Sequence, residues 1–351
     1  MSMQPAPNMN AAKYQCVICQ ASQWRRYSTF WSCEGCGHKY RCVSGIPRLY
    51  VEESLGEQDK RLRDYFYNGF LGSYYQQVMP FLSLPVRPAR AYWRGWLAYA
   101  LIVTSLVGLV VFIAPLLVAT NARNLMVARL SALLLFLIII VFLLKHRYLL
   151  YLLILAIPVK LSILRNRFRP VQSFAEVHAK ALQPFLESKE KLEVLDISTG
   201  SCNSLYRHGW MKLNANYTGL DLSETMLLQG QKFMTEKEVP MDFVLGDAGR
   251  LPFRPEKFDI VLNYGAINGF SNPKLALEEM ARVAKKGGLI FFLDEQLYEE
   301  AGFVERLYFK KVLSSHNTIH SCPVDLIPDS LGNIEVNQIY HFYYICTCQK
   351  M

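Results

Sequence analysis

The stretch that decides the fold is Tyr217-Thr218-Gly219-Leu220-Asp221-Leu222-Ser223-Glu224-Thr225-Met226-Leu227. A short apolar run of strand type ends on an acidic residue, Asp221, and a helix with Ser223 as its N-cap follows at once. This order places a carboxylate at the carboxyl edge of a parallel sheet, where ribose hydroxyls can be bound. Asp221 is therefore the first candidate cofactor residue.

The sequence on both sides of this stretch alternates between strand-like and helix-like segments. Leu192 to Cys202 reads as a strand, a tight turn and the start of a helix, and Asp196 precedes Asp221 by 25 residues. The alternation continues in residues 243–248, 251–253, 258–263 and 281–292, and residues 335–348 are expected to form the final strand pair. This pattern predicts an α/β fold with a doubly wound, Rossmann-like parallel sheet.

With these motifs, the sequence resembles the class I S-adenosylmethionine (SAM) dependent methyltransferases. Within them it is most similar to the small-molecule branch that includes ubiquinone and menaquinone C-methyltransferases. The resemblance covers residues 171–295 well and the tail to Met351 loosely, with four motifs in the family's order and spacing. It implies a seven-stranded methyltransferase sheet, SAM as the cofactor and methyl transfer as the reaction.

The resemblance also implies which residues contact the cofactor. The turn after the first strand would wrap the methionine half of SAM, and Asp221 would take the ribose hydroxyls. Leu222 would pack on the adenine, Asp247 and Ala248 would meet its edge, and Asn263 would lie where the methyl group emerges. The expected cofactor residues are Asp196, Ser198, Gly200, Cys202, Asp221, Leu222, Asp247, Ala248 and Asn263.

The glycine turn departs from the family pattern Asp-x-Gly-x-Gly-x-Gly. Gly200 is retained, whereas Ser198 and Cys202 occupy the outer positions. Glycine serves in such turns for positive φ and for close approach of the backbone. Two hypotheses therefore stay open: an active enzyme, and a catalytically silent membrane scaffold with the same fold. SAM binding discriminates between them.

The catalytic residue is left open by the sequence. Holding the acceptor close and aligned can supply most of the rate of an in-line methyl transfer, and a general base is needed only if the acceptor loses a proton. The candidates are His178, Asn263, Tyr264, His316 and His320, although a lone histidine is more often a surface or capping residue. The segment 263–266 lacks the two prolines of the Asn-Pro-Pro-Tyr element, which disfavours a nucleobase substrate.

Two Cys-x-x-Cys pairs near the N-terminus have the spacing of a metal site. Cys16 and Cys19 are followed, after thirteen residues, by Cys33 and Cys36. Four thiolates on two knuckle turns predict one tetrahedral zinc ion, with a structural role because its coordination is complete. Residues 37–49 resemble the end of zinc ribbons that precede some methyltransferases. Because rRNA guanine methyltransferases also carry such a ribbon, rRNA methylation is a third, weaker hypothesis.

Residues 62–79 form an amphipathic aromatic segment. It resembles the Tyr-Asp repeat that opens many methyltransferases and covers the SAM pocket, but Asn68 and Tyr75 replace the two aspartates. Tyr67 and Tyr74 are candidate lid residues, and plain packing is the alternative.

Apolar runs in the middle of the chain predict membrane insertion. Leu97–Ala119 has 23 residues without a charge, about 34 Å as a helix, and Leu125–Leu144 is interrupted only by Arg129. Basic residues flank both runs, so the positive-inside rule predicts an integral membrane protein with two transmembrane helices and both flanking parts cytosolic. The expected division is 1–13 disordered, 14–50 zinc ribbon, 51–90 aromatic helical linker, 91–169 transmembrane hairpin with a basic interfacial helix, and 170–351 methyltransferase domain.

Charge is distributed unevenly between the two halves. Up to Pro170 there are 20 Lys and Arg against 6 Asp and Glu, whereas the remainder has 18 against 23. Eleven basic residues between Arg87 and Arg169 flank apolar runs, which indicates anionic membrane lipids as partners rather than nucleic acid. Together these features predict a lipophilic acceptor such as a quinone precursor, an isoprenoid or a lipid.

Overall fold

The computed structural model describes residues 11–69, 72, 75, 171–308 and 321–351. The chain divides into one unit of residues 1–76 and 158–351 and a second unit of residues 77–157. All described residues belong to the first unit.

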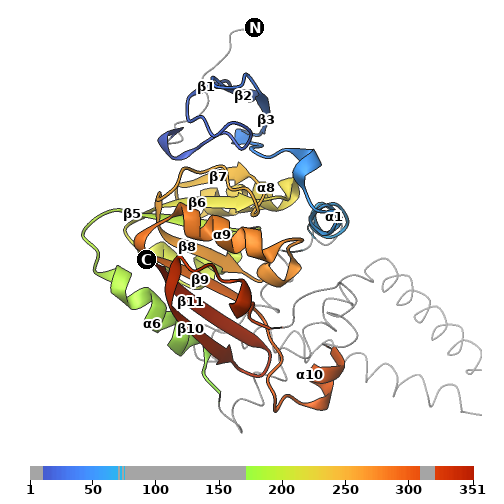
Figure 1. Cartoon of the computed structure of the whole chain (residues 1–351), viewed down its shortest axis with the longest axis vertical. Coiled ribbons are helices and arrows are strands. Elements are labelled where there is room, and N and C mark those ends of the chain that lie inside the picture. The colour runs from blue at the N-terminus through green and yellow to red at the C-terminus, as the bar shows by residue number, and fades with distance from the viewer. Residues whose placement is uncertain (1–10, 70–71, 73–74, 76–170, 309–320) are drawn as a thin grey trace, which may run out of the picture. The chain divides into compact units, whose positions relative to one another are not determined.

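A mixed seven-stranded sheet forms the centre of this unit, in the order β10-β11-β9-β8-β5-β6-β7 (Figure 1). Neighbouring strands from β9 to β7 run parallel, and β11 is antiparallel to both β9 and β10. The strands are β5 (Leu192–Ile197), β6 (Ala215–Asp221), β7 (Met241–Leu245), β8 (Phe258–Tyr264), β9 (Ala284–Glu295), β10 (Leu331–Ile339) and β11 (Tyr343–Lys350). The predicted seven-stranded, Rossmann-like fold is confirmed, but the sheet is mixed rather than wholly parallel because β11 runs antiparallel to both of its neighbours.

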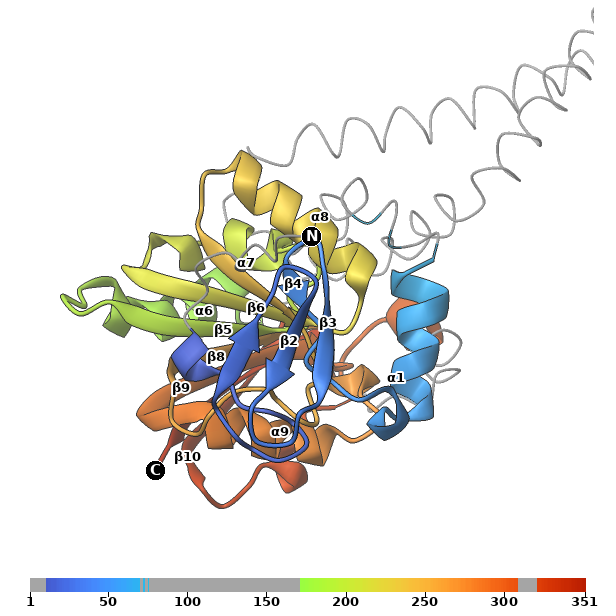
Figure 2. The same cartoon turned by 90° about the horizontal axis from the view of Figure 1, so that it is seen from above.

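Helices cover both faces of the sheet, which explains why the central strands are almost continuously apolar. Figure 2 shows α6, α7 and α8 on one face and α9 on the other. Their bounds are α6 (Phe174–Leu186), α7 (Asn203–Arg207), α8 (Glu224–Glu236) and α9 (Pro273–Val283). The predicted N-cap of α8 is present, since the Ser223 hydroxyl accepts a hydrogen bond from the Met226 N–H at 3.2 Å.

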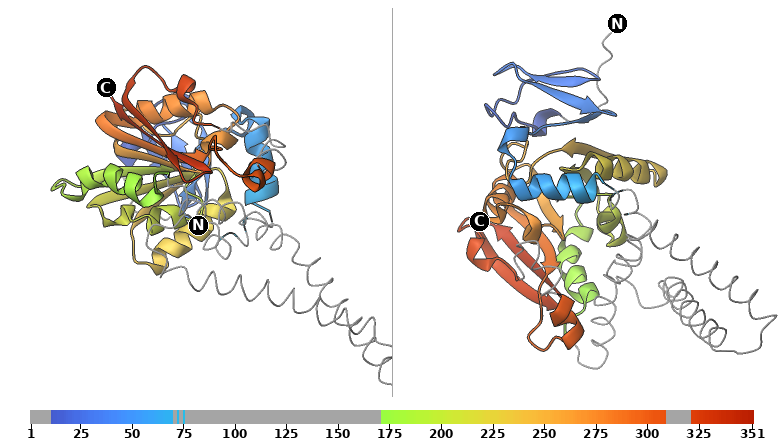
Figure 3. Two further views of the ribbon diagram at one scale, coloured as in Figure 1. Left: turned by 90° about the horizontal axis from the view of Figure 1, so that it is seen from below. Right: turned by 90° about the vertical axis from the view of Figure 1, so that its right-hand side faces the viewer.

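Short helices connect these elements. They are η1 (Ala11–Lys13), η2 (Glu52–Ser54), α1 (Glu57–Arg61), η3 (Leu62–Tyr67), η5 (Trp210–Lys212), η6 (Ile267–Gly269), α10 (Phe303–Tyr308) and η9 (Val324–Leu326). In Figure 3, α1 and η3 form one continuous blue helix. The η3 part has wide, π-type turns, because the Asn68 N–H bonds the Arg63 carbonyl five residues back.

The N-terminal module (residues 11–50) contains a four-stranded sheet in the order β1-β2-β3-β4. Its strands are β1 (Trp24–Arg26), β2 (Phe30–Cys33), β3 (Lys39–Val43) and β4 (Ile46–Pro47). The module shares one hydrophobic core with the large sheet, in which Tyr14 and Trp31 join Val244 and Phe253. It therefore folds as part of the same unit.

The module also covers the outer edge of β7. Arg48 pairs with Leu245 in parallel, and the Leu49 N–H donates to the Leu245 carbonyl at 2.8 Å. The Lys13 ammonium group donates to Asp242 on β7 and to Thr218 on β6, both at 2.6 Å. Lys13 was expected in a disordered tail, but it is 5% exposed. Its ion pair with Asp242 compensates the burial, so Lys13 is part of the packed structure rather than of a disordered tail.

The described helices do not support the predicted membrane insertion. Within residues 11–69, 72, 75, 171–308 and 321–351, no helix has the length and apolar character needed to cross a membrane. This finding contradicts the predicted integral membrane protein with two transmembrane helices, and that localisation is not retained. The expected spans, the interfacial helix and the basic segments for membrane lipids lie outside the described residues.

Candidate active site

A cavity of about 130 Å³ lies where β5, β6 and β8 end. Its sheet side is formed by the loops that follow these strands, and its other side by α1, η3 and Tyr75. The lining residues are Asp59, Leu62, Arg63, Tyr67, Tyr75, Ser198, Gly200, Asp221, Leu222, Ser223, Met226, Tyr264, Gly265, Ala266, Gly269 and Phe270. Such a crevice at the carboxyl ends of parallel strands is where α/β folds bind ligands.

Asp221 lies in the wall of this cavity at the end of β6. Its two carboxylate oxygens accept hydrogen bonds from the Gly200 and Ser223 N–H groups, both at 2.8 Å. Burial raises the pKa of Asp221 to about 6, and these N–H donors oppose the rise. A carboxylate has about four lone-pair sites, so Asp221 has acceptor capacity left for a further donor such as a ribose hydroxyl.

The turn between β5 and α7 keeps the shape of a glycine turn although two glycines are missing. Ser198, Gly200 and Cys202 have φ of 57°, 53° and 61°, the left-handed region that costs non-glycine residues about 1–2 kcal/mol each. The turn is packed tightly against α8, since a Cβ on Gly230 would lie 2.9 Å from both the Cys202 Sγ and the Gly200 carbonyl. Ser198 and Gly200 face the cavity, whereas Cys202 is buried behind them.

Asp196 lies at the end of β5 and is 2% exposed. Its Oδ2 accepts the Thr199 hydroxyl at 2.6 Å, and its Oδ1 has no hydrogen-bond partner among the described residues. Burial raises the pKa of Asp196 to about 7, and the nearby Asp221 charge adds to the rise. Asp196 does not line the cavity, and its Oδ1 is one of the buried polar atoms that the described residues leave without a donor.

Five of the nine expected cofactor residues do not line the cavity: the buried Asp196 and Cys202, and also Asn263, Asp247 and Ala248. Asn263 is fully buried, and its amide donates to the Ile197 carbonyl at 3.0 Å, which ties β8 to β5. Asp247 accepts the Gly249 N–H at 2.9 Å within its own turn, and Ala248 packs in the core. The structure thus gives these residues local roles and brings Ser198, Gly200, Asp221 and Leu222 together around the cavity.

The lid prediction falls partly within the described residues. Tyr67 and Tyr75 both line the cavity, with ring centroids 6.5 Å apart, and Tyr74 lies outside the described residues. Asn68 holds this segment to the start of α8, because its side-chain oxygen accepts the Ser223 hydroxyl at 2.7 Å and the Thr225 N–H at 3.2 Å. Asparagine therefore attaches the segment to the helix N-terminus although the family aspartate is absent.

The candidate catalytic residues differ in their position relative to the cavity. Tyr264 lines the cavity, and its hydroxyl accepts the Trp210 ring N–H at 2.6 Å. His178 instead packs among the rings of Phe174 and Trp210, where burial lowers its pKa to about 4. His316 and His320 lie outside the described residues. Tyr264 alone among these candidates is placed at the cavity within the described parts of the chain.

Sequence reasoning missed Asp59 and Arg63, which form part of the cavity wall. Arg63 is held by ion pairs to Glu52 and Asp64, both at 2.7 Å, and Asp59 exchanges hydrogen bonds with Ser271 at 3.0 and 3.1 Å. The contact between Asp59 and Ser271 joins segments that are more than 200 residues apart in the sequence. The spacing of four residues predicts that Asp59 and Arg63 share one face of a helix. It does not predict that this face lies beside Asp221.

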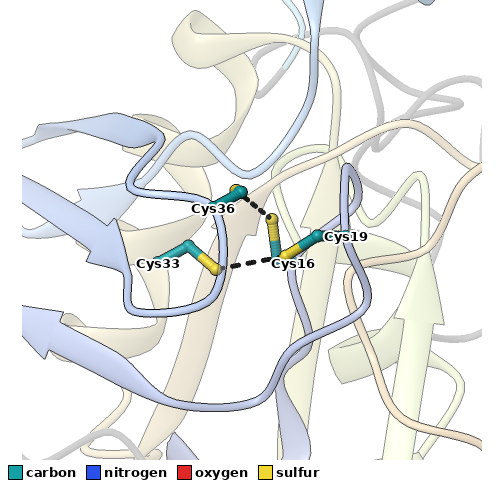
Figure 4. Close-up of side chains that lie close together, drawn as sticks. All are labelled: Cys16, Cys19, Cys33 and Cys36. Carbon is teal, nitrogen blue, oxygen red and sulfur yellow. Dashed lines mark hydrogen bonds between the residues drawn. The ribbon is translucent and has the colours of Figure 1, made fainter.

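The four expected metal-ligating cysteines meet at one end of the N-terminal module (Figure 4). Their Sγ atoms all lie within 4.8 Å of one another, with Cys16 to Cys36 at 3.7 Å and Cys19 to Cys33 at 3.5 Å. For Zn–S bonds of about 2.3 Å, tetrahedral geometry requires S–S distances of about 3.8 Å. The cluster therefore fits a zinc ion.

Both cysteine pairs lie on turns with the same hydrogen bonds. The Cys16 N–H donates to the Ala21 carbonyl at 2.8 Å and the Gln20 N–H donates back to Cys16 at 2.8 Å. The second pair repeats this pattern. The Cys33 N–H donates to the His38 carbonyl at 2.9 Å, and the Gly37 N–H donates to the Cys33 carbonyl at 2.9 Å. The predicted pair of knuckle turns is thus present.

Comparison with known proteins identifies the domain that carries the cavity. Residues 195–292 match the family described as a methyltransferase domain. A probable phthiotriol/phenolphthiotriol dimycocerosates methyltransferase 2 from Mycobacterium ulcerans is 38% identical over 119 residues, covering 33% of this chain and 43% of that protein. A ubiquinone/menaquinone biosynthesis C-methyltransferase from Ruegeria sp. is 29% identical over 130 residues, covering 36% and 52%.

The chain therefore spans about half the length of the curated relatives it matches. Among solved structures, phosphoethanolamine N-methyltransferase 2 from Haemonchus contortus in complex with SAM is 16% identical. The superposition covers 50% of this chain and 52% of the Haemonchus protein, with a TM-score of 0.42. Residues 195–292 are thus similar to a methyltransferase domain, and the order of the strands agrees with the fold that the sequence predicts.

Proposed function

We propose that this chain is a SAM-dependent methyltransferase that transfers a methyl group to a lipophilic small molecule. The observation that carries the proposal is the position of Asp221 in the cavity wall, beside the left-handed turn at Gly200. This is the arrangement by which a parallel α/β sheet holds a nucleoside. When bound, SAM supplies an electrophilic methyl group on a sulfonium ion.

The roles of the polar residues follow from their free acceptor sites. Asp221 accepts the ribose hydroxyls with the lone pairs that Gly200 and Ser223 leave open. The turn from Asp196 to Cys202, of which Ser198 and Gly200 line the cavity, wraps the methionine half. Leu222 and Met226 provide apolar surface for the adenine. These residues orient the cofactor, and alignment of the acceptor with the methyl group supplies the rate.

The acceptor end of the cavity supports a lipophilic substrate. Tyr67, Tyr75, Tyr264 and Phe270 give it aromatic walls, which suit a ring or an alkyl chain. Two relatives are named for phthiotriol and quinone compounds, which are lipophilic. A quinone precursor, an isoprenoid and a lipid are the substrate classes we propose.

The lost glycines favour the alternative of a silent scaffold, and the geometry of the turn argues against it. Ser198 and Cys202 adopt the left-handed conformation that glycine would take, so the backbone N–H of Gly200 still reaches Asp221. The shape of the site is retained at a cost in strain. SAM binding by the purified chain discriminates between the two functions.

The zinc proposal completes the organisation of the chain. Cys16, Cys19, Cys33 and Cys36 would bind one structural zinc ion and make residues 14–50 a zinc ribbon. Residues 170–351 would be the methyltransferase domain. Four thiolates fill a tetrahedral coordination sphere and leave no position for water, which assigns the metal a structural role.

The test uses SAM labelled in its methyl group, the purified chain, and a lipid extract from cells that lack the protein. Label is expected in an organic-soluble product with the wild type and not with Asp221→Asn. Glu236→Gln, an exposed change at the end of α8, is the matched control and retains labelling. Total rRNA serves as the second substrate arm, and label found only there would overturn the lipophilic acceptor. SAM binding without labelling of either extract would favour the scaffold.

A further inference from the structure

Asp59 is a carboxylate of the cavity wall that has no role in the proposed function so far. It lies on α1, outside the residues that match the methyltransferase family, and borders the same cavity as Asp221 from the opposite wall. Ser271 fixes it at two points: the Ser271 N–H donates to the Asp59 Oδ1 at 3.0 Å, and the Asp59 N–H donates to the Ser271 hydroxyl at 3.1 Å. The Asp59 side chain is therefore held in one orientation before a ligand arrives.

The lack of a side chain at Gly56 makes this attachment possible. A Cβ on Gly56 would lie 2.2 Å from the Ser271 Oγ and 2.9 Å from the Asp59 Oδ2. A larger residue would push α1 away from the loop that carries Ser271. The close approach joins the start of α1 to the segment that leads into α9, on the face of the sheet opposite to α7 and α8 (Figure 2).

The second carboxylate oxygen of Asp59 has acceptor capacity to spare. Among the described residues, no hydrogen bond or ion pair reaches this atom, Oδ2. Arg63 also lines the cavity, but its guanidinium group donates to Glu52 and Asp64. Asp59 thus offers a charged acceptor without a cationic partner to the molecule that occupies the cavity.

The position of Asp59 suits the adenine rather than the methionine half of SAM, which the ribose joins at opposite ends. The turn at Ser198 and Gly200, proposed for the methionine half, packs against α8, whereas Asp59 is fastened on the side of α9. Asp247, which the sequence places at the adenine edge, does not line the cavity and accepts the Gly249 N–H instead. Burial raises the pKa of Asp247, and the charge of Asp59 adds to the rise, which agrees with a position of Asp59 near this edge.

We propose that Asp59 selects the adenine base of the cofactor by accepting a hydrogen bond from its 6-amino group. This inference rests on the proposed SAM-dependent function. An ionised carboxylate accepts hydrogen bonds and donates none. Oδ2 therefore attracts an amino group and repels a carbonyl oxygen in the same place, which disfavours a base such as hypoxanthine.

The experiment measures, by calorimetry on the metal-loaded full-length chain, the binding of two molecules that differ only at position 6 of the base. They are S-adenosylhomocysteine and S-inosylhomocysteine, in which an oxygen replaces the 6-amino group. Neither carries a methyl group to transfer, so binding is measured without turnover. The wild type should bind S-adenosylhomocysteine about 10- to 100-fold more tightly, the range expected for one hydrogen bond to a charged group.

Asp59→Asn tests the residue directly. The asparagine oxygen can still accept the Ser271 N–H, and the side-chain amino group then takes the place of Oδ2. The ratio of the two affinities should fall by at least about tenfold, because the amino group donates to the oxygen of the inosine analogue and not to adenine. Asp59→Ala removes the acceptor without adding a donor and should lower the ratio as well. Glu57→Gln, on the same helix with a side chain 95% exposed, is the matched control and should keep the wild-type ratio.

Two kinds of result would overturn the role of Asp59. A wild type that binds both molecules equally, or a ratio that both Asp59 variants leave unchanged, would exclude base selection by this residue while SAM-dependent methyl transfer could stand. Binding of neither molecule by the wild type would overturn the proposed function and this inference with it. Circular dichroism confirms that each variant is folded.

Discussion

The ion pair between Lys13 and Asp242 gives the sharpest test of how the N-terminal module is attached. The side chains of Lys13 and Asp242 are 6% and 26% exposed, and the Lys13 Nζ lies 2.6 Å from both the Asp242 carboxylate and the Thr218 hydroxyl. Lys13→Met removes the cation and leaves Asp242 partly buried without this partner. Breaking a buried pair costs about 3–5 kcal/mol, and partial exposure of Asp242 lowers the expected loss to about 2–4 kcal/mol.

The assay is urea unfolding followed by circular dichroism and fluorescence, with a double-mutant cycle. Lys13→Met combined with Asp242→Asn should cost less than the two single changes together, with a coupling free energy of at least about 1 kcal/mol. Arg25→Met is the matched control, because the Arg25–Glu34 pair has a similar distance of 2.9 Å but side chains 72% and 43% exposed. That change should leave the unfolding free energy nearly unchanged. Equal effects of Lys13→Met and Arg25→Met, or additive changes in the cycle, would refute the reasoning.

Three further predictions concern pH and metal. Because the pKa of Asp221 is about 6, SAM affinity measured by calorimetry should be constant above pH 7 and weaken as the pH falls below 6. An unchanged affinity at pH 5 would contradict the role of Asp221. The pKa of His178 is lowered to about 4 from 6.5, so its contribution to stability is complete above pH 6.5 and is lost as the pH falls towards 4. The loss is about 3 kcal/mol, and unfolding of His178→Phe should lack this dependence. One zinc per chain should be found by metal analysis and be absent from Cys33→Ser with Cys36→Ser; zinc retained in that double variant would refute the site.

Local sequence patterns were sufficient for the sheet and for part of the site. The run that ends at Asp221 and the N-cap Ser223 are adjacent in the chain, so strand period and capping chemistry predict both. The same holds for the cysteine pairs, because knuckle turns close within six residues. In each case the residues that interact to fix the structure are close to one another in the sequence.

The remaining site residues depend on contacts between distant segments. Asn263 was expected at the cofactor because it ends β8, but a one-residue change in side-chain direction along a strand moves a residue from one face to the other. Its side chain binds the Ile197 carbonyl instead. Lys13 and Asp59 were missed because their partners are more than 200 residues away in the chain. Arg63 pairs with nearby residues, but its position in the cavity wall depends on how its helix lies against the distant strand ends.

The covered edge of β7 has a consequence for solubility. β7 is the last strand of its sheet, and the backbone groups of Leu245 are occupied by Arg48 and Leu49. A free strand edge is a template for pairing with another chain. Any change that detaches the N-terminal module would expose this edge together with the aromatic residues beneath it. Loss of the module is therefore expected to appear first as concentration-dependent aggregation, before the sheet itself unfolds.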